Sequence, residues 1–263
     1  MSFDAQRAAA ALHACRLSHA VSTLPGELAP RDEAEGVAVQ RARAALLGAD
    51  PPGGFKIGAT ARKMQDYLGL TGPLAGFMLA ADLHPSGASL PWATLRGAGV
   101  ECEIAVRLAD DLPARACTPE QAAAAVGAVF AAIELVENRY GPPPAGDLEA
   151  IGVPTLVADQ VYHRAAVLGA PAAGWRDLDL AALAGRIAID GAIQAEGTGA
   201  DLLGHPMQAL AWLANSATAR GFGGLRAGQV IMLGSVTAPI WLDGPCSVTV
   251  EFDHLGTVQL RLC

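Results

Sequence analysis

Val100-Glu101-Cys102-Glu103-Ile104-Ala105-Val106 is an apolar stretch interrupted by two glutamates that stand two positions apart. A strand alternates its side chains, so both glutamates would share one face and Cys102 would point to the other. Glutamate is depleted in strands and is almost never fully buried without a partner. Two carboxylates on one face, about 7 Å apart by the rise of a strand, would repel each other. A divalent cation between Glu101 and Glu103 would remove the repulsion; a solvated strand face is the alternative.

A third carboxylate stands in the next apolar stretch. A helix is expected from Thr118 through about residue 129, because Thr118 suits the N-cap, a proline follows it and Gln121 closes a capping box. Residues 132–139 are β-patterned and contain Glu134. Strand, helix and strand in succession are typical of a βαβ unit, which brings two strands side by side. Glu134 could then complete a three-carboxylate site, and oxygen-only ligands suit Mg²⁺ or Mn²⁺ rather than zinc.

The composition is that of a globular protein with a large core. The chain has 263 residues, of which 52% are hydrophobic and 17% charged. We expect a single catalytic domain over residues 1–263, with a helical region over residues 1–50 and a metal-binding, β-rich core over residues 51–263. The net charge of −8 and the lack of a basic stripe argue against a nucleic-acid partner. The longest apolar run, residues 122–133, is too short to cross a bilayer, so no membrane partner is expected.

The five cysteines are odd in number and lack CxxC spacing, so neither a disulfide framework nor a zinc site is indicated. A reducing, cytoplasmic compartment is the simplest interpretation.

Local patterns predict the remaining elements. Helices are expected over residues 4–18, 31–47, 60–68 and 206–220, the last ended by Gly221. Strands are expected over residues 156–158, 186–189, 192–196, 229–233, 247–252 and 258–262.

Five ordered blocks of the chain resemble the 2-keto-4-pentenoate hydratase family, in the hydratase/decarboxylase branch of the fumarylacetoacetate hydrolase superfamily. Phe55-Lys56-Ile57-Gly58-Ala59-Thr60 is similar to GYKIGLT, and residues 101–105 are similar to E-x-E-I-A. Residues 133–139 are similar to LEIVDSR, residues 203–215 to LGHPLNALAWLAN, and residues 228–237 to GDVVLTGSLT.

The resemblance implies a mixed α/β fold with a fumarylacetoacetate hydrolase-like rolled β-sheet core and an N-terminal helical region. It implies Mg²⁺ or Mn²⁺ held by Glu101, Glu103 and Glu134, a small-molecule 2-keto acid substrate and a homo-oligomer. The implied reaction is that of a hydro-lyase, which adds water to a 2-hydroxy-2,4-dienoate in the breakdown of aromatic compounds. A 2-keto acid can chelate the cation through its carboxylate and keto oxygens, and the enolate that forms is stabilised.

The chain departs from the family in one stretch. An ADNASSG-like segment usually lines the substrate pocket, and here it reads Ala158-Asp159-Gln160-Val161-Tyr162-His163-Arg164. Larger and basic side chains replace small polar ones, which leaves the tail of the substrate open. Val37 stands where a tyrosine is common, and Glu137 replaces an aspartate.

Lys56 is the candidate for proton transfer or for binding the substrate carboxylate. We expect it to be partly buried, which would lower its pKa; a surface lysine at a strand end is the alternative. Four further residues are candidates for contact with the substrate: Asp82, Ser235, Thr237 and His163, the last as a reader of a distal carboxylate. His205 is expected to begin a helix rather than to bind a metal, and Glu137 and Arg139 are candidates for a structural ion pair.

Three other functions remain open. A metal-dependent decarboxylase of a 2-keto dicarboxylate would use the same enolate, and Arg139-Tyr140 is similar to the SRY segment of that branch. Hydrolysis of an acylpyruvate usually needs a His–Glu pair near the N-terminal helices, where the sequence offers no convincing one. A non-catalytic partner subunit would fit the divergent stretch, but the retained Lys56 and three glutamates argue against it.

Overall fold

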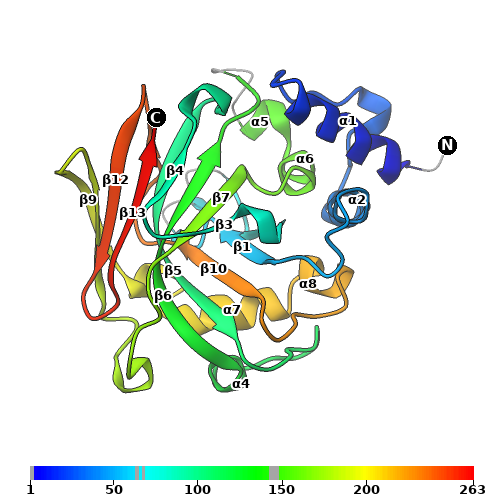
Figure 1. Cartoon of the computed structure of the whole chain (residues 1–263). Helices are drawn as coiled ribbons and strands as arrows, with labels where there is room; N and C mark the ends of the chain where they lie inside the picture. The colour runs from blue at the N-terminus through cyan, green and yellow to red at the C-terminus, as the bar shows by residue number, and fades with distance from the viewer. Residues whose placement is uncertain (1–2, 63–64, 67–68, 142–147) are drawn as a thin grey trace.

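Two β-sheets and a group of N-terminal helices make up the structure, a computed structural model that describes residues 3–62, 65–66, 69–141 and 148–263 (Figure 1). The larger sheet has eight strands, in the order β2-β1-β10-β5-β6-β7-β3 with β11 paired to β5. Its strands are β1 (Gly54–Gly58), β2 (Leu74–Met78), β3 (Leu83–Pro85), β5 (Ala98–Leu108), β6 (Val126–Glu137), β7 (His163–Leu168), β10 (Val230–Ser235) and β11 (Ile240–Trp241). The mixed α/β fold with a curled sheet confirms the expected fold class.

The smaller sheet has five strands, in the order β4-β13-β12-β8-β9. They are β4 (Ala88–Leu90), β8 (Ala184–Ile189), β9 (Ala192–Thr198), β12 (Cys246–Phe252) and β13 (Gly256–Leu262). The helices are α1 (Ala5–Leu17), α2 (Glu33–Leu46), α4 (Pro119–Ala124), α5 (Leu148–Ile151), α6 (Val153–Ala158), α7 (Pro206–Ala214) and α8 (Ala217–Gly221). Figure 1 shows α1, α2 and α6 together on the side of the molecule opposite β9 and β12.

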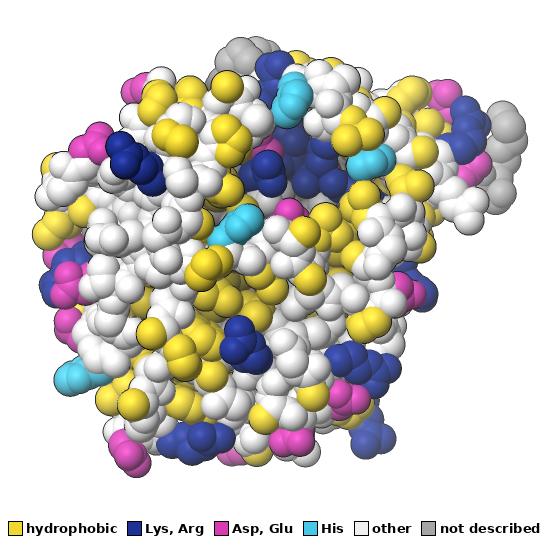
Figure 2. Space-filling view, in the orientation of Figure 1, with side chains coloured by type: hydrophobic (Ala, Val, Ile, Leu, Met, Phe, Trp, Pro, Cys, Tyr) yellow, Lys and Arg dark blue, Asp and Glu magenta, His cyan; other side chains and the backbone are white. Residues whose placement is uncertain are grey.

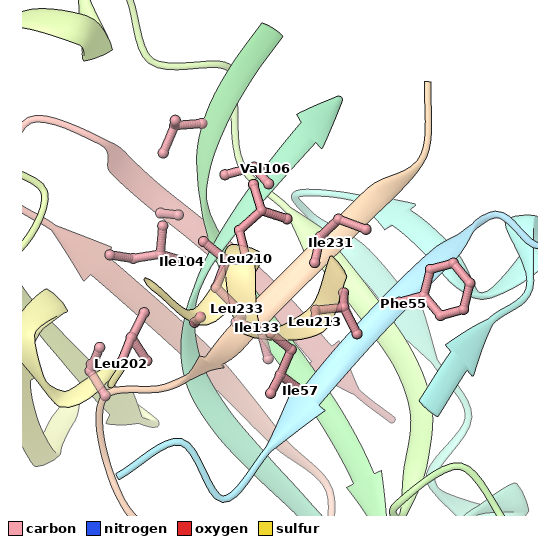
Figure 3. Close-up of a cluster of buried hydrophobic side chains, with 14 of the residues drawn as sticks. Phe55, Ile57, Ile104, Val106, Ile133, Leu202, Leu210, Leu213, Ile231 and Leu233 are labelled. Carbon is pink, nitrogen blue, oxygen red and sulfur yellow. The ribbon is translucent and has the colours of Figure 1, made fainter. Parts of the chain in front are cut away.

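The main core lies on one face of the larger sheet, against the smaller sheet and α7. Ile104 of β5, Ile133 of β6 and Ile231 of β10 meet Leu210 and Leu213 of α7 there (Figure 3). All five side chains are fully buried. Burying one such side chain stabilises the fold by about 1.5–3 kcal/mol, so this face holds the long central strands in place.

The opposite face of the same strands is also buried but carries a different set of side chains. Ala105, Phe130, Ala132 and Met232 form a smaller apolar cluster there, and charged residues lie on the same face further along β1, β5 and β6. Because side chains alternate along a strand, residues that point away from the main core enter this second, enclosed space.

The hairpin of β5 and β6 corrects the βαβ expectation. The two strands pair antiparallel along almost their whole length. The helix that joins them, α4, spans only six residues, although its capping box from Thr118 and Gln121 is present as expected. It ends before Val126 because the residues from there on pair with β5, with Val129 opposite Val106. A helix of six residues rises only about 9 Å, too little to carry the chain back along the 11 residues of β5, so the next strand runs antiparallel to it.

Two other expectations about elements are wrong. Residues 156–158 lie in the helix α6, which packs on α2 and starts with a proline in its first turn. The helix expected over residues 206–220 is divided at Asn215 and Ser216, because the hydroxyl of Ser216 accepts from the amide of Ala219 and caps α8.

The remaining expected elements are confirmed as α1, α2, β8, β9, β10, β12 and β13, with small shifts of their ends. The helix expected over residues 60–68 includes positions 63–64 and 67–68, which lie outside the described residues. Within the described ranges, no helix is both long and apolar enough to cross a membrane.

Candidate metal centre

Three glutamates meet on the second face of the larger sheet. Glu101 of β5 lies directly opposite Glu134 of β6, and Glu103 follows two positions further along β5. Each offers one carboxylate oxygen, and these oxygens all lie within 4.8 Å of one another. Glu103 and Glu134 are fully buried, whereas Glu101 is partly exposed. The alternation of β5 and the register of the hairpin together create this cluster.

The cluster fits a divalent cation. Oε1 of Glu103 is buried and has no hydrogen-bond partner, and Oε2 of Glu134 is buried beside the ammonium of Lys56. A buried carboxylate oxygen without a partner costs free energy, and a hard cation with oxygen ligands removes that cost. Oε2 of Glu103 accepts from the amide of Gly234 at 3.0 Å, which orients the carboxylate.

Burial and mutual repulsion among the three glutamates shift their pKa values. Burial and the charge of Glu134 raise the pKa of Glu101 to about 8. Burial, Glu134 and Glu101 raise the pKa of Glu103 well above its usual range. Burial also acts to raise the pKa of Glu134, but Lys56 and His163 outweigh it and lower that pKa to about 2. Without a cation, therefore, the three carboxyl groups are not all ionised at neutral pH.

Lys56 lies on β1, on the same face as the glutamates. Its Nζ is 3.2 Å from Oε2 of Glu134 and donates to the carbonyl of Val161 at 3.0 Å. The side chain is almost fully buried, more than the partial burial that was expected, and the expected lowering of its pKa is wrong. Burial lowers the pKa of Lys56, yet attraction to the surrounding glutamates is larger in sum and raises it.

His163 contacts the same carboxylate from the other side. Its Nδ1 lies 2.8 Å from Oε1 of Glu134, and the side chain is fully buried. This contact differs from the expected one with a distal substrate carboxylate, because His163 is the first residue of β7 and points inward beside β6. A histidine that holds a ligand carboxylate in place has a positioning role.

Of the other candidates, Ser235 and Thr237 lie near Glu103, whereas Asp82 lies in a separate pocket. Ser235 pairs with Glu103 across β5 and β10, its hydroxyl bonds both backbone groups of Cys102, and it lies 3.4 Å from the hydroxyl of Thr237. Asp82, in contrast, lines a pocket beneath the N-terminal helices, with its Oδ1 4.0 Å from Arg164.

Two further structural expectations are confirmed. Glu137 and Arg139 form an ion pair at 3.4 Å. His205 is the N-cap of α7 and accepts from the amide of Met207.

Sequence reasoning missed the backbone that shapes the site. Gln160, Val161 and Tyr162 all have positive φ angles, of 64°, 51° and 66°. A β-branched residue in this region is an outlier, and each such residue costs about 1–3 kcal/mol unless its surroundings enforce it. The departure from the family at residues 160–164 was the only signal of this turn. The turn brings the carbonyl of Val161 to Lys56 and His163 to Glu134.

Comparisons with known proteins identify relatives of this chain. Residues 59–262 match the family model described as fumarylacetoacetate (FAA) hydrolase C-terminal. A 2-keto-4-pentenoate hydratase of Burkholderia vietnamiensis is 34% identical over 206 residues, which are 78% of this chain and 76% of the relative. A 4-oxalocrotonate decarboxylase of Pseudomonas putida is 29% identical over 79% of this chain and 76% of the relative.

Solved structures show the same fold. The 4-oxalocrotonate decarboxylase from Pseudomonas putida G7, complexed with magnesium and adipate, is 25% identical and has a TM-score of 0.86 over 98% of this chain and 97% of that chain. A fumarylpyruvate hydrolase from Pseudomonas aeruginosa, in complex with Mn²⁺ and pyruvate, is 15% identical, with a TM-score of 0.63 over 79% of this chain and 88% of that chain, and shows the fold alone.

Proposed function

The chain belongs to the fumarylacetoacetate hydrolase family, and from this we propose that it is a metal-dependent hydro-lyase that adds water to a 2-hydroxy-2,4-dienoate and forms a 4-hydroxy-2-keto acid. The observation that carries the proposal is the cluster of Glu101, Glu103 and Glu134 with the ammonium of Lys56 beside it. Relatives named 2-keto-4-pentenoate hydratase and 2-hydroxyhexa-2,4-dienoate hydratase support the same reaction class. We place the reaction in the breakdown of aromatic compounds.

Glu101, Glu103 and Glu134 would hold Mg²⁺ or Mn²⁺ in this proposal. Support comes from the buried, unpartnered Oε1 of Glu103 and from the magnesium, calcium and manganese in the solved relatives. When bound, the cation supplies Lewis-acid stabilisation of negative charge on the 2-keto oxygen.

The protein side chains would handle the protons and the orientation of the substrate. Lys56 keeps its proton on Nζ because its raised pKa favours the charged form. It could pass that proton to the substrate or bind the substrate carboxylate through it. The hydroxyl of Thr237 would donate to a substrate oxygen just beyond the end of β10, and that of Ser235 would give up its bond to the carbonyl of Cys102 to do the same. The closely packed face around Lys56 would exclude water other than the reacting one.

A decarboxylase of a 2-keto dicarboxylate is the second candidate. Two observations favour it: the solved 4-oxalocrotonate decarboxylase covers nearly the whole chain, and curated decarboxylases lie among the relatives. Both reactions pass through the same enolate, so the arrangement of the carboxylates does not separate them.

One assay tests both candidates. Chelator-stripped protein is offered a panel of 2-hydroxy-dienoates, with and without Mg²⁺ or Mn²⁺, while loss of the dienol and release of CO₂ are both followed. Metal-dependent loss of the dienol without CO₂ is the expected result. Release of CO₂ would assign the decarboxylase reaction instead, and metal binding without any turnover would favour a non-catalytic partner subunit.

We also propose that the chain acts as a homo-oligomer in the cytoplasm. All five cysteines are free thiols, which supports a reducing compartment. Light scattering of the purified protein measures its mass in solution, and a monomer's mass of 26.8 kDa would contradict the first part of this proposal.

A further inference from the structure

Five arginines line one pocket beneath the N-terminal helices. They are Arg16, Arg43, Arg96, Arg139 and Arg164, and the pocket has a volume of about 200 Å³. Figure 2 shows a recess with Lys and Arg side chains at its floor and histidines near its rim. We call it the arginine pocket. Its lining includes none of the three clustered glutamates and not Lys56.

Positive charge exceeds negative charge in the arginine pocket. Asp82 and Glu137 line it, and the buried Asp159 lies behind it. Five guanidinium groups therefore face three carboxylates, which gives this set of residues a net charge of +2. Arginine does not lose its proton in proteins, so the imbalance cannot be relieved by titration.

The imbalance is greatest around Asp159. Its carboxylate lies 2.9 Å from Arg16, 3.3 Å from Arg43 and 3.1 Å from Arg139. Three arginines thus share one carboxylate that is almost fully buried. Buried charge without compensation costs several kcal/mol per ion, so a further anion close to these groups would stabilise the structure.

Arg43 supplies an unused donor. Its side chain is only 3% exposed, it lines the pocket, and its Nε has no hydrogen-bond partner. Its Nη1 donates to Asp159 and Gln160. A buried guanidinium donor without an acceptor is rare in native proteins, so the positive charge of Arg43 is incompletely satisfied by its neighbours.

A buried turn separates the arginine pocket from the metal centre. On one side, Arg16 and Arg139 both donate to the carbonyl of Asp159 at 3.0 Å. On the other side, the carbonyl of Val161 accepts from Lys56, and His163 contacts Glu134. A molecule in the pocket would touch residues one layer removed from the glutamates.

We propose that the arginine pocket binds a small anion of the carboxylate or phosphate class at a site separate from the three glutamates. The donors are the guanidinium groups of Arg43 and Arg164, with Arg16 and Arg139 providing the surrounding positive potential. Two sources share this chemistry: a free anion, or the far carboxylate of a substrate that reaches past the turn.

Titration calorimetry with inorganic phosphate tests the site on the full chain, both chelator-stripped and loaded with Mg²⁺. We expect one phosphate per chain with similar affinity in both forms. Arg43→Gln and Arg164→Gln should each weaken binding by about ten-fold or more, because one charge-assisted hydrogen bond is lost. Arg164 is about one-third exposed, so its variant remains informative if Arg43→Gln fails to fold. Arg186→Gln, which removes an arginine paired with Glu251 on the smaller sheet, is the matched control and should bind as the parent does.

Phosphate binding that appears only with Mg²⁺ would place the anion at the metal centre and overturn the proposal. No binding, or equal binding by parent and both pocket variants, would overturn it as well. Steady-state kinetics of Arg164→Gln distinguish a free anion from the far carboxylate of a substrate as the natural occupant of the pocket. A higher KM for substrates with a carboxylate tail, but not for those with a neutral tail, identifies the substrate; an unchanged KM for both identifies a free anion. The phosphate titration does not depend on turnover, so its result is independent of the proposed reaction.

Discussion

Nδ1 of His163 lies 2.8 Å from Oε1 of Glu134, and both side chains are fully buried. The other oxygen of the same carboxylate lies 3.2 Å from Nζ of Lys56. Glu134 is therefore held from two sides before any cation binds, which reduces the ordering that binding would require.

His163→Ala should weaken Mn²⁺ binding by about 10–100-fold, the range typical of lost partners of metal ligands. The reason is that Glu134 loses the donor that orients it. Titration with Mn²⁺ measures the change, and His163→Asn, which retains a donor near the position of Nδ1, should recover part of the affinity. Equal affinity in the parent and in His163→Ala would disprove the positioning role.

Lys56→Met should lower kcat by about 10²–10⁴-fold, the contribution typical of a positioned proton donor. The affinity for Mn²⁺ should stay nearly intact, because Lys56 is not one of the three clustered carboxylates. Kinetics and Mn²⁺ titration on the same preparation check both statements. Undiminished turnover would remove Lys56 from the mechanism.

Glu103→Gln should abolish the rise in Tm that Mg²⁺ produces without lowering the Tm of the metal-free protein. The raised pKa of Glu103 means that the folded state prefers the neutral form, so its ionisation destabilises the metal-free fold as pH rises past the unfolded value. A neutral amide avoids that cost but weakens the cation site. Thermal unfolding at pH 8, with and without Mg²⁺, measures both effects, and a Mg²⁺-induced rise equal to the parent's would contradict the assignment.

Asp159→Asn should destabilise the protein at pH 7 by about 3–5 kcal/mol, because three arginines lose a buried counter-ion. Burial alone would raise the pKa of Asp159, but Arg139, Arg16 and Arg43 outweigh it and hold that pKa below its usual range. The ion pairs therefore stabilise the fold above the unfolded pKa of about 3.9, and this contribution is lost as pH falls from there through the folded pKa.

Denaturant unfolding from pH 7 downward checks the effect of Asp159→Asn. The gap between parent and variant should stay constant to about pH 4 and narrow below it. Asp111→Asn is the matched control, because its partner Arg226 lies on the surface at 3.0 Å and such pairs contribute little. A gap that narrows already between pH 7 and pH 5 would contradict the stated sign.

Gly234→Ala should weaken both folding and Mn²⁺ binding. Gly234 has a φ of +109°, and an added Cβ would lie 2.3 Å from Oγ1 of Thr60. Its amide donates to Glu103, so a shift of the backbone would move a carboxylate of the cluster. Gly228→Ala is the control that separates backbone strain from the clash with Thr60. Gly228 also has a positive φ, but nothing lies within 4 Å of the added Cβ. Only Gly234→Ala should affect Mn²⁺ affinity.

Several features of the protein depend only on residues that are neighbours in the chain. Glu101 and Glu103 share a face because side chains alternate along any strand. The capping box at Thr118 forms within four residues, and α1 and α2 start at local N-caps, so their positions could be predicted before any packing was known. The matching blocks added the family, and with it the curled sheet.

Other features depend on segments that are far apart in the chain and meet only when it folds. The register that sets Glu101 opposite Glu134 comes from packing on both faces of the β5–β6 hairpin, and no local signal distinguished it from a parallel unit. Residues 156–158 form a helix because α2 packs against them. The pKa of Lys56 was predicted to fall but is raised. The residues next to Lys56 in the sequence predicted only its burial, whereas the attraction that outweighs burial comes from glutamates on two other strands. Pairing between strands that are distant in the sequence brings these charges to Lys56, and no single stretch of sequence specifies that pairing.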